Sequence, residues 1–196
     1  MSKGLIIAIV FGIIVMFGGF WACNKRNGFV SLREDAKAQW QQVESQYQRR
    51  ADLIPNIVAT VKGEANFEKG TLEAVVQARA SATQVKVNLD DMSQESIAKF
   101  QAAQGSLSNA LGKLMMITEN YPNLKANQAF ADLRVELEGC ENRISVQRMK
   151  YNDSSKEYNK AIQMFPGSLI AGSSFQPMPY FEAEAGAEKA PKVSFE

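Results

Sequence analysis

The chain has 196 residues and a formal net charge of +1, from 22 basic and 21 acidic side chains. This length is sufficient for one domain with a buried core and a small appendage, and the balanced charge argues against a nucleic-acid partner. The chain has no histidine, so the most common general base and metal ligand is missing.

Residues 4–22 form an uncharged run rich in Ile, Val, Phe and Gly. As a helix this run would be about 28 Å long, close to the thickness of a bilayer's hydrocarbon core, and Trp21 suits the membrane interface. We therefore predict a membrane-spanning helix. A cleaved signal peptide is disfavoured because the run is long and no A-x-A site follows it. A lipoprotein signal ending at Cys23 is disfavoured because bulky Phe20 and Trp21 precede Ala22.

The basic residues around this run indicate an orientation. Lys3 stands alone before it, whereas Lys25, Arg26, Arg33 and Lys37 follow it. Since lysine and arginine accumulate on the cytoplasmic side, we expect an exterior N-terminus and a cytoplasmic domain.

The sequence becomes amphipathic at Phe29, and apolar residues recur at helical intervals as far as Val61. This pattern predicts the first helix of the domain. Because a proline inside a helix removes one backbone hydrogen bond, Pro55 predicts a kink or a short 3₁₀ turn near residues 52–55. A second, short helix is expected to begin with Thr71 as its N-cap.

Residues 85–91 are expected to form a loop, and residues 93–96 resemble a helix start. The third helix would end before Pro122. We interpret the following residues as a turn in which Asn123 caps the next helix, although a recognition loop is the alternative. The last helix is predicted over residues 130–165, because the residue before Pro166 is disfavoured in helical conformation.

Four helices with no convincing strand predict an all-α fold: a single N-terminal transmembrane helix, then an antiparallel four-helix bundle with long first and last helices, and an irregular C-terminal tail. The expected divisions are residues 1–28 for the anchor, 29–166 for the bundle and 167–196 for the tail.

Several strings in the sequence resemble the LemA family of bacterial membrane-anchored proteins. They are QRRADLIPNIV (48–58), TVKG (60–63), TLEAV (71–75), ALGKL (110–114), YPNLKAN (121–127), YN (151–152 and 158–159) and FPGSLIA (165–171). The chain departs from the family pattern at Ala51, where tyrosine is more frequent. The resemblance implies a membrane helix, a helical cytoplasmic bundle and no established enzymatic activity.

Arg50 is expected to pair with a carboxylate across the bundle. If Val30 lies level with Phe165 in an antiparallel pair of equal rise, position 50 faces a position near 145, within a turn of Glu141. We therefore predict a structural ion pair between Arg50 and Glu141. The alternative is an anion or partner site formed by Arg49, Arg50 and Asp52.

The Tyr-Asn pair at 151–152 is repeated one heptad later at 158–159. We favour a role in fixing helix register through buried hydrogen bonds over a polar ligand cavity. Cys23 and Cys140 belong to different segments and are interpreted as free thiols. No phosphate loop, nucleophile with a base, or zinc spacing occurs, so we expect no catalysis, metal or cofactor.

The tail carries large apolar residues but no charge between positions 167 and 181, which is unusual for a solvated segment. We expect it to return to the membrane-proximal end and to act there as an interface through Leu169, Ile170, Phe175, Met178, Tyr180 and Phe181. The alternative is that these side chains fold back on their own bundle.

The sequence thus favours a non-enzymatic, membrane-anchored scaffold that contacts the lipid bilayer and self-associates into a homo-oligomer. An adaptor that binds another membrane protein or a protease is the second hypothesis, and an enzyme is the third.

Overall fold

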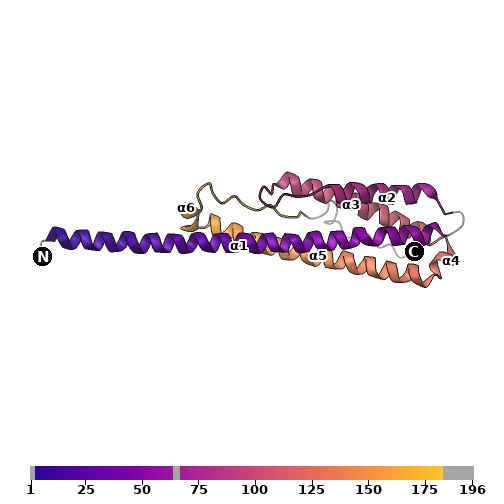
Figure 1. The fold of residues 1–196 in the computed structure, drawn as a ribbon, viewed down its shortest axis with the longest axis horizontal. Helices are drawn as coiled ribbons and strands as arrows, with labels where there is room; N and C mark the ends of the chain where they lie inside the picture. The colour runs from indigo at the N-terminus through magenta and orange to yellow at the C-terminus, as the bar shows by residue number, and fades with distance from the viewer. Residues whose placement is uncertain (1–2, 64–66, 183–196) are drawn as a thin grey trace, which may run out of the picture.

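The computed structural model describes residues 3–63 and 67–182 of the chain. Within these ranges it contains only helices and connections, which confirms the all-α fold class. Figure 1 shows two antiparallel pairs: α1 lies beside α5, and α2 lies beside α3 on the half of α1 far from the N-terminus. The helices are α1 (Lys3–Lys62), α2 (Lys69–Gln84), α3 (Gln94–Thr118), α4 (Pro122–Lys125), α5 (Gln128–Gln163) and α6 (Gly167–Ala171).

Helix α1 runs unbroken from the apolar segment into the packed part of the molecule (Figure 1). Its 60 residues correspond to a rod about 90 Å long. Among the described residues it is the one helix long and apolar enough to cross a membrane, with a window of mean hydropathy 2.6 that is not buried in the molecule. The boundary expected after residue 28 therefore lies inside a continuous helix.

Helix α1 also stays α-helical through Pro55, so the expected 3₁₀ turn is absent. Proline at position 55 has no N–H to donate to the carbonyl of Ala51, four residues earlier. In its place the Nε of Arg79, on α2, donates to the Ala51 oxygen at 2.7 Å. A side chain from a neighbouring helix thus satisfies the carbonyl that the proline leaves unpaired.

Two helix starts follow the expected chemistry to different degrees. The predicted start near Ser93 is confirmed, because the Ser93 hydroxyl accepts from the N–H of Ser96, and the Ser96 hydroxyl accepts from the N–H of Ser93, each at 3.1 Å. Thr71, in contrast, is not the N-cap of α2, since the helix begins after Glu68. Thr71 lies in the first turn, where its hydroxyl donates to the Glu68 carboxylate at 3.0 Å.

The connection before the last helix also differs from the prediction. Helix α3 ends at Thr118, before Pro122 as expected, but Pro122 begins the short α4. Asn123 lies inside that helix and does not cap α5. The cap is Asn127, whose side chain accepts from the N–H of Phe130 at 3.2 Å. Helix α5 consequently occupies Gln128–Gln163 instead of residues 130–165.

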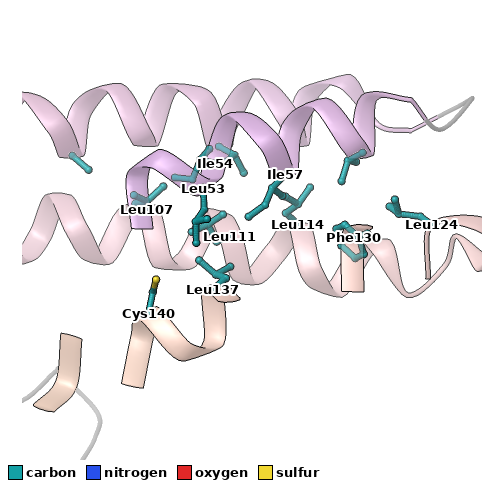
Figure 2. Packing of buried hydrophobic residues seen from close by; sticks show 13 residues of the cluster. Leu53, Ile54, Ile57, Leu107, Leu111, Leu114, Leu124, Phe130, Leu137 and Cys140 are labelled. Carbon is teal, nitrogen blue, oxygen red and sulfur yellow. The ribbon is translucent and has the colours of Figure 1, made fainter. Parts of the chain in front are cut away.

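Three apolar clusters follow the α1–α5 pair along its length. The cluster farthest from the N-terminus draws on α1, α2, α3, α4 and α5, as Figure 2 shows. The middle cluster surrounds Trp40, and the third lies around Phe29 at the end near the apolar segment. Because α2 and α3 have only 16 and 25 residues against 36 in α5, neither reaches the third cluster. Helix α2 contributes to the first cluster and α3 to the first two, and the third is completed by the tail.

The tail is more ordered than expected. It begins with α6, which packs on α1 and α5 so closely that a Cβ on Gly167 would overlap the carbonyl oxygen of Ala161 and lie 3.2 Å from the Phe29 ring. Glycine is therefore required at this approach. From there residues 172–182 run without helix or strand toward α3 (Figure 1).

Candidate functional site

Arg50 is almost completely buried, with 1% of its surface exposed. Its Nη1 donates to the Glu141 carboxylate on α5 and to the Ser108 hydroxyl on α3, each at 2.7 Å. Its Nη2 donates to the side-chain oxygen of Gln104 at 2.7 Å and to the carbonyl of the same residue at 3.2 Å. The guanidinium group thus links α1 to both α3 and α5.

The network around Arg50 extends to α2, because the Gln104 amide donates to the carbonyl of Ala82 at 3.2 Å. The guanidinium also lies 5.1 Å from the ring centre of Tyr47, a cation–π distance. Both terminal nitrogens of Arg50 therefore point to protein partners, which is the geometry of a structural cross-link.

The neighbouring charges do not converge on one ligand. Arg49 is mostly exposed and donates to Glu136 at 3.0 Å, and this hydrogen bond raises the pKa of the Arg49 guanidinium. Asp52 instead accepts from Gln48 at 2.7 Å. Because Arg49, Arg50 and Asp52 have separate partners, the arrangement does not support the alternative of a shared anion site.

The repeated Tyr-Asn pairs of α5 hold the tail against this helix. Asn152 donates to the Phe181 carbonyl at 3.0 Å and accepts from the Phe181 N–H at 2.9 Å. One heptad later, Asn159 donates to the Met178 carbonyl and accepts from the Met178 N–H, both at 2.7 Å. Each asparagine therefore satisfies both backbone groups of one tail residue.

The two tyrosines of the same repeat add a hydrogen bond each. The Tyr151 hydroxyl donates to the Pro179 carbonyl at 2.9 Å, and the Tyr158 hydroxyl donates to the Gln176 carbonyl at 3.0 Å. Burial raises the pKa of Tyr151 to about 12 and also raises the pKa of Tyr158. Both phenols are protonated donors at neutral pH, as an unperturbed phenol also is.

The side chains of the tail divide into two groups. Phe175, Met178 and Phe181 are buried within their own chain, at 6–7% exposure. Phe181 stacks on Trp40 with ring centres 5.3 Å apart, and Phe175 meets Phe29 edge to face at 5.5 Å. These three side chains therefore pack back on their own chain. Contact with another molecule through them would require the tail to leave its position.

The remaining predicted interface residues are more accessible. Leu169 on α6 is 75% exposed, and Tyr180 is 38% exposed. Ile170 is half-buried against the cluster around Phe29. The six predicted residues thus lie along one segment but not on one exposed face.

From the sequence, the Tyr-Asn repeat was predicted to fix the register of the helices. Its partner is the tail backbone, and Trp40 supplies the aromatic surface beside it. The spacing of seven residues between the two pairs was the feature of the sequence that indicated a shared role. Nothing local in the sequence identified the tail as the matching segment.

Other chemistry is sparse in the described part of the chain. No group of three or more metal-ligating side chains occurs among residues 3–63 and 67–182. Cys23 is exposed and Cys140 is buried, and neither forms a disulfide. A cavity of about 400 Å³ opens between α1, α2 and α3, and its lining includes Glu44, Lys86 and Gln104 but no cysteine.

Comparison with known proteins identifies relatives for most of the chain. A family model described as LemA family matches residues 39–195. The magnetosome protein MamQ of Magnetospirillum gryphiswaldense is 29% identical over 179 aligned residues, covering 82% of this chain. Magnetosome proteins MamQ 1 and MamQ 2 of Paramagnetospirillum magneticum are each 26% identical over 180 residues, covering 83% of this chain. The chain spans 66% of the length of these relatives.

Proposed function

Since this chain belongs to the LemA family, we propose that it is a non-enzymatic, membrane-anchored scaffold whose helical domains associate laterally into a homo-oligomer. The relatives named above are called magnetosome proteins. For this chain we propose the cell membrane, through residues 4–22, as the site of action. Within the membrane-proximal domain, α1, α5, α2 and α3 would act together as the body of an antiparallel four-helix bundle.

The continuity of α1 is the observation that carries this proposal. One helix contains both the apolar segment and some of the buried residues of each of the three clusters. A rigid helix without a linker holds the domain at a fixed distance from the apolar segment. Copies anchored in the same membrane would therefore present equivalent surfaces to one another, which favours lateral association.

The end of the domain next to the apolar segment carries apolar side chains suited to such contacts. Met164, Phe165 and Leu169 are 56%, 78% and 75% exposed, and Lys25 lines the same hollow as Met164 and Phe165. Burying each of these side chains against a neighbouring copy would be worth on the order of 1.5–3 kcal/mol. This surface supports self-association close to the lipid headgroups.

The mass of the full chain in detergent tests the proposal. The purified protein, analysed by light scattering coupled to size exclusion, should have a protein mass several times 21.7 kDa. Leu169→Asp should reduce this mass, whereas Val135→Asp, at an exposed site on α5 far from α6, should leave it unchanged. A monomer at all concentrations would contradict the scaffold and favour the adaptor hypothesis, in which a membrane protein or protease supplies the partner.

A further inference from the structure

The contacts between α5 and the tail have the form of a peptide-recognition groove. We define the tail groove by Tyr151, Asn152, Tyr158 and Asn159 of α5 together with Trp40 of α1. Six hydrogen bonds from the two Tyr-Asn pairs reach backbone groups of Gln176, Met178, Pro179 and Phe181. Main-chain hydrogen bonds provide affinity for an extended peptide, and pockets for alternate side chains provide selectivity.

The occupant matches this groove in its side chains as well. Met178 and Phe181, the two residues whose backbones are held by asparagines, are both buried. The residues preceding Met178 and Tyr180 are prolines, which have no N–H to satisfy and favour an extended backbone. The groove therefore selects an extended segment with apolar side chains three residues apart, with one proline before the first of them and one between them.

We propose that the tail groove also accepts residues 176–182 of a second copy, so that neighbouring molecules exchange tails; this inference rests on the self-association proposed above. The second copy is the favoured occupant because it carries the segment already seated in the groove, and exchange replaces each contact with an identical one. Exchange of an identical element is a low-cost route to association.

The membrane anchor makes this exchange geometrically possible. Every copy has its groove at the same distance from its apolar segment, because both belong to the same rigid arrangement of α1 and α5. Residues 172–175, between α6 and the groove, span about 13 Å when extended, comparable to the diameter of one helix. Gly172 has φ +50°, a conformation that glycine leaves readily. Tail exchange thus requires copies packed directly side by side.

Isotope-resolved photo-crosslinking tests this proposal on the full chain. Tyr180, whose hydroxyl lies 2.9 Å from the Asn159 amide, is replaced by a benzoylphenylalanine, and ¹⁴N-labelled and ¹⁵N-labelled chains are unfolded, mixed equally and refolded into the same vesicles. Tail exchange predicts crosslinks between residue 180 and α5 that join light and heavy chains, approaching half of the total. Crosslinks confined to chains of one label would overturn it.

Matched variants separate recognition from proximity. Asn152→Ala with Asn159→Ala should reduce the mixed-label crosslinks at least several-fold, whereas Asn120→Ala with Asn123→Ala, at exposed sites outside the groove, should not. Circular dichroism checks that both variants retain their helices. An oligomeric mass with single-label crosslinks would reject tail exchange and leave the scaffold intact, whereas a monomeric mass would reject both proposals.

Discussion

At the scale of single residues, Arg50 is the most consequential polar group in the core. It is buried, while the side chain of its partner Glu141 is 43% exposed. Removing the carboxylate would leave a buried cation with only neutral partners, which is costly. The exposure of Glu141 reduces this cost, because solvent screens the pair.

We expect Glu141→Ala to lower the free energy of unfolding by about 2 kcal/mol, between the values for exposed and buried ion pairs. Glu138→Ala is the matched control, since Glu138 faces Arg134 at 3.6 Å on the exposed surface of the same helix. Thermal or urea unfolding of the two variants provides the measurement. Equal losses of stability would show that the Arg50–Glu141 pair has no special role.

The buried phenol of Tyr151 predicts a dependence of stability on alkaline pH. Its pKa is about 12 in the folded chain against 10.0 for the free group, so the unfolded state releases the proton first as the pH rises. This contribution is fully present below pH 10 and is lost between pH 10 and about 12. Two pKa units at about 1.36 kcal/mol each put the upper bound of this contribution at about 3 kcal/mol.

Tyr151→Phe should therefore reduce stability by about 1 kcal/mol at pH 8, because the hydrogen bond to Pro179 is lost. The difference in stability from the unmodified chain should narrow and then reverse sign as the pH rises from 10 toward 12, because only the unmodified chain loses the contribution of Tyr151. Urea titrations at a series of pH values measure this change. A constant difference over that interval would mean that Tyr151 ionises equally in the folded and unfolded states.

At the scale of helices, the joint between α1 and α2 explains how Pro55 is tolerated. The Ala51 carbonyl accepts from Arg79 because Pro55 cannot donate to it. This arrangement couples a proline in one helix to an arginine in the next. The coupling can be measured by a double-mutant cycle.

Arg79→Ala should destabilise the chain by about 1–2 kcal/mol, since it leaves a partly buried carbonyl unpaired. In a Pro55→Ala background the restored N–H of residue 55 can donate to Ala51, and the same arginine substitution should cost roughly half as much. Urea unfolding of the four proteins gives the coupling energy. Additive effects would indicate that Arg79 stabilises the chain through other contacts.

At the scale of the whole molecule, the distribution of basic residues predicts an orientation in the membrane. Lys25, Arg26, Arg33 and Lys37 follow the apolar segment, and basic residues favour the cytoplasmic side. Two of them contact the tail, since Arg26 and Arg33 lie 5.2 and 5.6 Å from the ring centre of Phe175. We therefore expect the helical domain in the cytoplasm.

Thiol accessibility in intact cells tests this orientation. In a background with Cys23→Ala and Cys140→Ala, a cysteine replacing Ser2 should react with an impermeant reagent, whereas one replacing Glu138 on α5 should react only after lysis. Ser2 lies outside the described residues. Ser194, where a cysteine would report on the end of the tail, also lies outside them. The reverse pattern of labelling would place the domain outside the cell.

The sequence by itself determined the helical class, the apolar segment and the helix start at Ser93, because these follow from local periodicity and capping. It also placed Glu141 within a turn of Arg50, since antiparallel helices of equal rise oppose each other in a fixed register, and the structure has the two groups 2.7 Å apart. These features depend on neighbours in the sequence or on a simple geometric rule.

Only the tertiary structure decided how α1 continues through Pro55 and where the tail lies. The first depends on Arg79, which is 28 residues from Ala51, and the second on Asn152, which is 29 residues from Phe181. Backbone groups in a proline-containing helix or a nonhelical tail have no local partner, so distant side chains determine their conformation. Periodicity records which face of a helix is buried, but it does not record which segment fills the space beside that face.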